Sequence, residues 1–216
     1  MDKMQQMTRD GRKIENNSFA IIDHEIDSLH GGHTFDPQQW NVVRRAIHTS
    51  GDFEFAKLYQ FSENATQAGI GALKNGAPII SDVTMITSGL SQQRLSVYRN
   101  RAHCFISDPQ VIAKAKQTGE TRAIWSMRHA RDLGLLDGAI VAIGNAPTAL
   151  YEILRMAEAG EAKPALVIGI PVGFVKADTA KEALAHSSLE FITSHGRKGG
   201  SPLVVSSIHA LLTEAV

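Results

Sequence analysis

His48 is the side chain whose type and position best suit proton-transfer chemistry. It stands near the end of a predicted helix that starts at Pro37, and the turn-forming residues 49–52 (TSGD) follow it directly. Histidine changes its charge near neutral pH, as a general acid requires. Arg45 lies one helical turn earlier, where a guanidinium could hold an acidic substrate beside the imidazole. A histidine at a helix end can also bind the last carbonyl groups of that helix, so a capping role stays open.

A glycine-rich segment near the carboxyl end of the chain is a candidate anion site. It consists of Gly196, Arg197, Lys198, Gly199, Gly200 and Ser201, immediately before Pro202. Glycines let a backbone approach a ligand closely, amides at a helix start face an anion, and arginine can bind a carboxylate with two bonds. The segment differs from a Walker loop, because the lysine precedes the glycine pair. A surface loop whose glycines only satisfy turn geometry would have the same composition, so both interpretations stay open.

Composition restricts the partners and the compartment. The 216 residues include 22 Lys and Arg against 22 Asp and Glu, which gives no net charge and argues against broad binding to nucleic acid or anionic membranes. The one cysteine, Cys104, has no partner for an internal disulfide, which favours a reducing compartment. Residues 1–13 are polar, and no apolar run reaches the roughly 18 residues that a membrane span needs. We therefore expect a cytoplasmic protein without a signal peptide or a membrane span.

Short apolar runs and helix signals alternate through the last two thirds of the chain. The expected strands are residues 79–83, 102–106, 139–143, 165–170 and 191–193. They are too continuously apolar to have one solvated face, so helices must cover both faces of the sheet. We expect a three-layer αβα fold with a doubly wound, mostly parallel sheet, formed by residues 1–216 as a single domain.

Capping signals place several helices. Asp36-Pro37 with Gln39 predicts a capping box, and Asp108-Pro109 predicts a second start of the same kind. Further helices are expected over 64–74 and 147–160, after Pro202, and over 18–29 in a helical amino-terminal segment. In such a fold, ligands bind beyond the carboxyl ends of the strands, which points to the loops at 144–148, 171–175 and 196–201.

Other motifs are weaker. His24-Glu25 begins like a zinc protease motif, but Ser28 stands where the second histidine would be, and His30 and His33 are expected to be surface or capping residues. Residues 69–74 begin like a dinucleotide fingerprint, but they lack its third glycine and precede a strand. We therefore predict neither a metal site nor a nucleotide fingerprint.

Taken together, several segments resemble one family, the precorrin-8X and cobalt-precorrin-8 methylmutases of cobalamin biosynthesis. The matching segments are Ile14-Glu15-Asn16-Asn17-Ser18-Phe19, Arg45-Ala46-Ile47-His48 with Gly51-Asp52, Gly76-Ala77-Pro78-Ile79-Ile80-Ser81-Asp82, Thr121-Arg122, and residues 144–150, 171–175 and 196–201. They extend over almost the whole chain, and their combination is far more specific than any one of them.

The resemblance implies a flavodoxin-like fold, a homodimer and an isomerase. In this reaction a methyl group migrates from C-11 to C-12 of a tetrapyrrole, giving hydrogenobyrinate, or cobyrinate when cobalt is present. The family's catalytic histidine falls on His48, which would protonate ring C, and the substrate-binding residues fall on Ser18, Arg45 and Arg122. No cofactor or methyl donor is implied. No role is assigned to Asp52, because some relatives carry a different polar pair at Gly51-Asp52.

The macrocycle has acetate and propionate arms, and each carboxylate needs a cation or a backbone N–H group as its partner. The arms would therefore explain why the sequence combines Arg45, Arg122 and Arg197 with glycine-rich helix starts. Residues 171–175 could pack against the ring face, and product could pass to the next enzyme of the pathway. Two alternatives stay open. One is a non-catalytic carrier of a corrinoid intermediate, and the other is a phosphate-binding α/β enzyme that uses the glycine loops.

Overall fold

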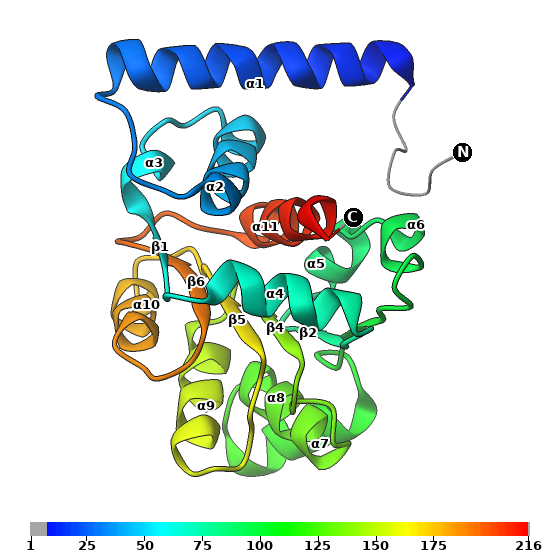
Figure 1. The fold of residues 1–216 in the computed structure, drawn as a ribbon. Helices are drawn as coiled ribbons and strands as arrows, with labels where there is room; N and C mark the ends of the chain where they lie inside the picture. The colour runs from blue at the N-terminus through cyan, green and yellow to red at the C-terminus, as the bar shows by residue number, and fades with distance from the viewer. Residues whose placement is uncertain (1–7, 216) are drawn as a thin grey trace.

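A computed structural model of the chain describes residues 8–215, and its centre is one six-stranded sheet (Figure 1). The strands are β1 (Tyr59–Phe61), β2 (Ile79–Ser81), β3 (Ala102–Cys104), β4 (Ile140–Ile143), β5 (Leu166–Gly169) and β6 (Phe191–Ser194). They lie in the order β1-β6-β5-β4-β2-β3. The expected strands at 79–83, 102–106, 139–143, 165–170 and 191–193 are all present. Most are shorter than expected, because apolar residues continue into the loops.

The sheet has the doubly wound topology that the sequence predicts. Strands β2 to β6 are parallel to their neighbours, and β1 pairs antiparallel with β6. Counted along the chain, the five parallel strands take the spatial order 2-1-3-4-5, which is that of flavodoxin. The order reverses between β2 and β4. In such sheets the crevice at the carboxyl end of this switch point is the usual ligand site.

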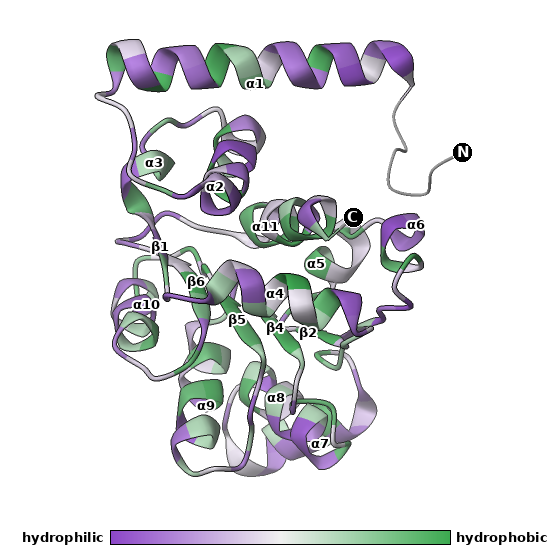
Figure 2. Ribbon diagram, in the orientation of Figure 1, coloured by the Kyte–Doolittle hydropathy of each residue, from purple (hydrophilic) through white to green (hydrophobic). Residues whose placement is uncertain are grey.

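Helices cover both faces of the sheet (Figure 1). They are α1 (Arg9–Leu29), α2 (Pro37–Ser50), α3 (Phe55–Leu58), α4 (Ala65–Lys74), α5 (Thr84–Gly89), α6 (Gln92–Leu95), α7 (Pro109–Thr118), α8 (Arg122–Asp132), α9 (Pro147–Glu158), α10 (Ala177–Ala185) and α11 (Ser201–Glu214). Alternate strand residues enter two cores: Ile79 and Ile140 pack with α2, α4 and α11, whereas Ile80 and Val141 pack with α8, α9 and α10. This explains why the strands are apolar throughout, as Figure 2 shows for β4 and β5.

The predicted capping signals lie where the helices begin. Asp36 accepts hydrogen bonds from the backbone N–H groups of Gln38 and Gln39, and the side chain of Gln39 accepts the N–H of Asp36, so the capping box at α2 is confirmed. Asp108 caps α7 in the same way through the N–H of Gln110. Helix α2 ends at Gly51, whose φ of 67° is one that glycine adopts without strain.

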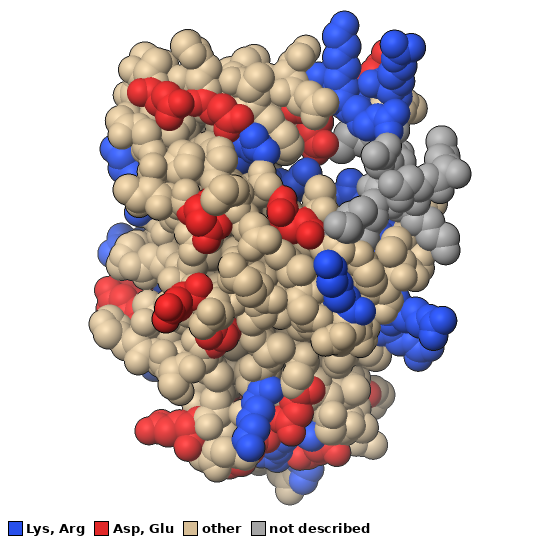
Figure 3. Space-filling view, in the orientation of Figure 1, with Lys and Arg blue, Asp and Glu red and all other residues tan. Residues whose placement is uncertain are grey.

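Helix α1 is longer than the expected span of 18–29. It begins at Arg9, and the side chain of Thr8 accepts the N–H of Gly11 as its cap. The added turns are mostly charged and polar (Figure 2), so their sequence has no apolar periodicity from which a helix could be predicted. Lys and Arg side chains gather at this end of α1 (Figure 3), where Arg9, Arg12 and Lys13 line one hollow.

None of the helices described between residues 8 and 215 combines the length and apolar character that a membrane crossing requires. Of the polar stretch 1–13, residues 1–7 lie outside the described part of the chain.

The tight fit of β5 against its helices is testable at Gly169. A Cβ atom there would lie 2.6 Å from a methyl carbon of Leu184 and 3.1 Å from one of Leu150. Gly169→Ala should therefore lower the free energy of unfolding by about 1–3 kcal/mol in urea denaturation, because it overpacks the core. Gly71→Ala in α4 is the matched control: nothing lies within 4 Å of the added atom, so it should raise stability by about 0.5–1 kcal/mol. Equal stability of Gly169→Ala and the parent would contradict this packing.

Candidate active site

His48 lies in the last turn of α2 and is held by a residue of α1. Its Nδ1 is 2.8 Å from the hydroxyl of Ser18, and the Phe19 ring meets the imidazole edge-on with centroids 5.4 Å apart. The hydroxyls of Thr49 and Ser50 bind the carbonyls of Arg45 and Ala46, and the N–H of Gly51 binds that of Ile47. The imidazole of His48 instead bonds a side chain of α1, not a carbonyl of its own helix.

This arrangement suits an acid. A protonated imidazole carries hydrogen on both nitrogens, so it can donate Nδ1–H to the Ser18 oxygen and keep Nε2–H for a substrate. The His48 side chain is exposed, which leaves it open to a ligand. The two residues are thirty positions apart and meet only because α1 packs on α2.

Arg45 is also held from α1. Its Nη1 is 2.8 Å from the carboxylate of Glu15, and the two side chains are 15% and 17% exposed. The guanidinium carbons of Arg44 and Arg45 lie 4.5 and 5.3 Å from the centre of the Phe19 ring. The cation is therefore fixed in place beside His48, because it has both a carboxylate and an aromatic neighbour.

The glycine-rich segment is packed against the end of β5. A Cβ atom at Gly199 would lie 2.4 Å from the carbonyl oxygen of Ile170, and the N–H of Gly200 donates to the same oxygen at 2.8 Å. Gly196 has a φ of 68° and open space around it. The protein's own backbone thus leaves no room for a side chain at Gly199. Ser201 is only 5% exposed.

Two lysines fix the same segment. Lys181, 1% exposed, donates to the carbonyl of Lys198 at 2.7 Å and contacts the hydroxyl of Ser194 at 3.3 Å. Burial lowers the pKa of Lys181 to about 8. The ammonium of Lys198 binds Asp52 and Glu54, and this bond lowers the pKa of Asp52. Lys198 therefore ties the loop to the residues that follow His48.

Asp82 organises the switch point of the sheet. This carboxylate is fully buried directly after β2, and it accepts the N–H groups of Gly144, Asn145 and Ala146 at 3.1, 2.9 and 2.6 Å. Burial raises the pKa of Asp82, and the three N–H bonds oppose that rise. The clamped turn lies directly against α11, because a Cβ atom at Gly144 would be 2.7 Å from the Cα of Ser201. Asp82 thus joins the loops after β2 and β4, and Gly144 in turn contacts the start of α11, which follows β6.

Arg122 and Arg197 occupy the same edge of the sheet. Arg122 is the first residue of α8, and the hydroxyl of its cap residue, Thr121, is 3.0 Å from that of Thr148, just after the turn held by Asp82. The guanidinium carbon of Arg197 lies 5.4 Å from the centre of the Phe174 ring.

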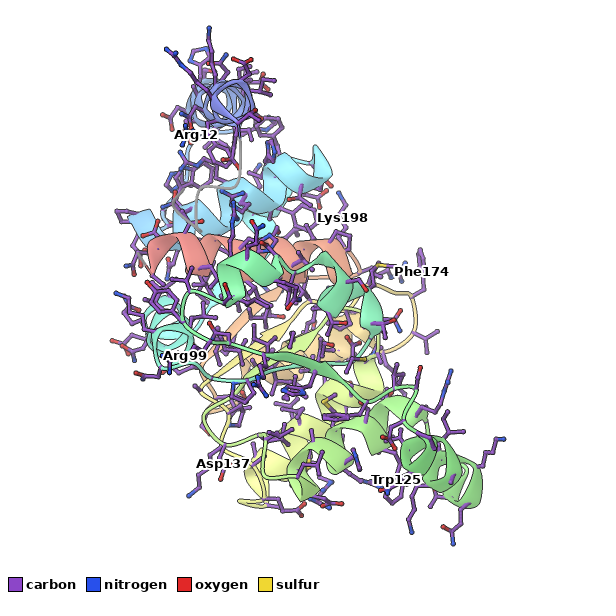
Figure 4. All side chains as sticks on the ribbon, turned by 90° about the vertical axis from the view of Figure 1, so that its right-hand side faces the viewer. Arg12, Arg99, Trp125, Asp137, Phe174 and Lys198 are labelled. Atoms are coloured by element: carbon purple, nitrogen blue, oxygen red, sulfur yellow. The ribbon has the colours of Figure 1, made fainter. Side chains whose placement is uncertain are left out.

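Exposed apolar side chains follow two of the strands at this edge. Met85, after β2, is 63% exposed, and Val172, Phe174 and Val175, after β5, are 49%, 82% and 78% exposed. Figure 4 shows Phe174 and Lys198 on one side of the molecule and Asp137, which precedes β4, on the other. Exposed apolar side chains grouped in this way mark a binding surface.

Neither His30 nor His33 belongs to a metal cluster. His30 stacks on Phe53 and His33 stacks on Trp40, with ring centroids 4.6 and 3.9 Å apart. Within the part of the chain that the structure describes, no group of three or more His, Cys, Asp and Glu side chains could hold a metal ion.

Comparison with known proteins identifies one family for the chain. The model of the precorrin-8X methylmutase family matches residues 13–214. This chain belongs to the precorrin-8X methylmutase family.

Several members are similar over nearly their whole length. A cobalt-precorrin-8 methylmutase of Leptospira interrogans is 46% identical, covering 97% of this chain and 96% of that protein. A precorrin-8X methylmutase of Pseudomonas aeruginosa is 39% identical, covering 95% and 97%. The crystal structure of precorrin-8X methylmutase from Thermus thermophilus superposes with a TM-score of 0.88 at 46% identity, covering 94% of this chain and 96% of that one. The expected family and fold are thereby confirmed.

Sequence reasoning missed several residues that shape this candidate site. Glu15 and Asp82 lie in the segments that resemble the family, but neither was singled out. Asp82 had a signal, because a carboxylate directly after a buried parallel strand points to the ligand edge of the sheet. Lys181 had none, since a lysine within a helical pattern is usually solvated.

The buried amine of Lys181 predicts a dependence of stability on pH. Its pKa is lowered from 10.5 to about 8, so between these values the unfolded chain binds more protons than the folded one, and stability rises with pH. Relative to Lys181→Met, the parent should gain on the order of 3 kcal/mol in free energy of unfolding between pH 7 and 11. Urea denaturation over this range measures it. Lys163→Met, at an exposed lysine, should show no such change. A constant difference between the parent and Lys181→Met would refute the assignment.

Proposed function

We propose that this chain moves a methyl group from C-11 to C-12 of precorrin-8X or cobalt-precorrin-8, giving hydrogenobyrinate or cobyrinate, with His48 as the general acid. Family membership supports the reaction. The observation that carries the role of His48 is its 2.8 Å bond to Ser18, which engages Nδ1 on an exposed face of the protein beside Arg45.

The chemistry follows from this bond. His48 in its protonated form gives the proton of Nε2 to ring C, while Ser18 keeps the imidazole oriented through Nδ1. The methyl group then breaks its bond to C-11 and forms one to C-12 within the same molecule. Substrate and product are isomers, so the proton returns to the imidazole and no methyl donor is consumed.

Cations and apolar side chains would hold the macrocycle. We assign substrate binding to Ser18, Arg45, Arg122, Gly196, Arg197, Gly199, Gly200 and Ser201. The guanidinium groups bind acetate and propionate arms. The exposed patch of Met85, Val172, Phe174 and Val175 packs against the ring face, which is large and apolar.

The remaining expectations concern assembly and location. Ile14, Ile21 and Leu29 of α1 are 69%, 57% and 71% exposed and recur at spacings of seven and eight, which places them on one face of the helix. A second copy of the chain would cover them in a homodimer. We further propose that residues 1–216 form a single domain, that the protein acts in the cytoplasm, and that it hands its product to the next enzyme of the pathway.

Substitution of the acid tests the central role. His48→Ala should lower kcat by about 10²- to 10⁴-fold, because general acid catalysis contributes that much, while Kd for hydrogenobyrinate stays within about threefold. His186→Ala, at an exposed histidine at the end of α10, is the control and should keep the parent's rate. Turnover by His48→Ala at the parent's rate would reject the assignment.

Arg45 should act in binding. Arg45→Ala should raise Kd for hydrogenobyrinate by about tenfold or more, because it removes a charged partner of a carboxylate. Glu15→Gln separates this role from the Glu15–Arg45 ion pair: it removes the carboxylate but keeps the guanidinium, so its binding should be at least as tight as the parent's. If both substitutions weakened binding equally, the ion pair and not the cation would explain the effect.

Anaerobic incubation with precorrin-8X tests the reaction itself. Methyl migration creates the corrin chromophore, so the visible spectrum should change, and mass should not. A non-catalytic carrier of corrinoid intermediates would bind without conversion and leave the chromophore of precorrin-8X in place. Running the assay with metal-free and cobalt-containing macrocycles decides which of the two substrates this chain uses.

A further inference from the structure

A hollow of about 300 Å³ adjoins His48 between α2, α5 and α11. Its lining includes Arg45 and Thr49 from α2, Met85 and Gly89 from α5, and Pro202 and His209 from α11. Thr49 is the neighbour of His48 in sequence, and Pro202 follows directly on the glycine-rich segment. The hollow therefore lies between the last turns of α2, the helix that carries the proposed acid, and the loop edge of the sheet. It is too small for a tetrapyrrole, and its size suits one side arm.

Positive charge exceeds negative charge around the hollow. Arg94 of α6 is not one of the residues that line it, but burial and then the charge of Arg45, which does line it, lower the pKa of Arg94. The carboxylate of Glu15 opposes the effect. Two guanidinium groups and one carboxylate leave one net positive charge. In addition, Arg94 Nε is buried and has no hydrogen-bond partner among residues 8–215. An incoming anion would neutralise the excess positive charge and could accept a hydrogen bond from Arg94.

His209 adds a directional donor to this hollow. Its Nε2 accepts the backbone N–H of Ser91 at 3.1 Å. Burial and the charges of Arg94 and Arg45 lower the pKa of His209 to about 4, so the ring is neutral at physiological pH. A neutral imidazole has one hydrogen, and since Nε2 is an acceptor here, that hydrogen is on Nδ1. His209 lines the hollow, so its ring brings one N–H donor to this part of the protein.

We propose that this hollow is a carboxylate subsite, in which Arg45 and His209 bind one acidic arm of the ligand and the nearby charge of Arg94 strengthens that binding. The identity of the ligand rests on the proposed function; the preference for a carboxylate rests on the charges and donors of the hollow. An arm seated there is held one helical turn from His48, so it sets the edge of the macrocycle that faces the acid.

The test compares two forms of one ligand. Kd is measured by absorbance titration for hydrogenobyrinate and for the same corrin with its carboxylates converted to amides. Arg94→Met should raise Kd for the acid about tenfold, as expected for a lost charge-assisted interaction, and Kd for the amide by less than about threefold. Arg101→Met is the control, because Arg101 is exposed at the opposite, amino-terminal edge of β3, and it should change neither value.

His209 gives a second, independent pair of variants. His209→Leu removes the donor and should raise Kd for the acid about tenfold, whereas His209→Gln can accept the Ser91 N–H and still donate, so it should bind within about threefold of the parent.

The outcomes separate the two proposals. If the parent converts precorrin-8X but Arg94→Met weakens acid and amide equally, or weakens neither, the subsite is wrong and the proposed function stands. Equal binding by the leucine and glutamine variants would also overturn the subsite. If the parent neither binds nor converts the macrocycle, the proposed function fails and the subsite with it.

Discussion

The buried carboxylate of Asp82 is the contact on which the loop edge of this protein depends. A charge removed from water must be compensated, and here three consecutive backbone N–H groups, at residues 144–146, do so. The carboxylate stands at the point where the strand order reverses. Its three hydrogen bonds therefore fix the loops at the switch point, where the loops of a doubly wound sheet run in opposite directions. Because Gly144 has no room for a side chain against Ser201, this constraint extends to the start of α11.

The proposed general acid is held in place by another element. His48 is on the surface, at the end of a helix, and its orientation comes from Ser18 on α1 and not from the sheet. Glu15 of the same helix holds Arg45. Helix α1 therefore positions both the proposed acid and Arg45, while the sheet positions the loops on which we propose that the ring rests. Lys198 joins the two parts, because it ties the glycine-rich segment to Asp52 and Glu54 just after His48.

Much of this architecture could be predicted from local patterns. Buried parallel strands are apolar on both faces, and capping residues such as Asp36 and Asp108 act within three residues of themselves, so both are visible in the sequence. Strand β1 was not predicted, since three residues carry no periodicity. The contacts Ser18–His48 and Lys198–Asp52 join residues 30 and 146 positions apart, and such pairs follow from helix packing that no local pattern encodes.

The role of His48 as the acid depends on where its imidazole lies relative to the bound macrocycle. A crystal structure of the protein with hydrogenobyrinate bound measures it directly. We expect Nε2 within about 3–3.5 Å of ring C, with Nδ1 still bonded to Ser18. An imidazole turned away from the macrocycle, or a ligand bound at another edge of the sheet, would contradict the mechanism.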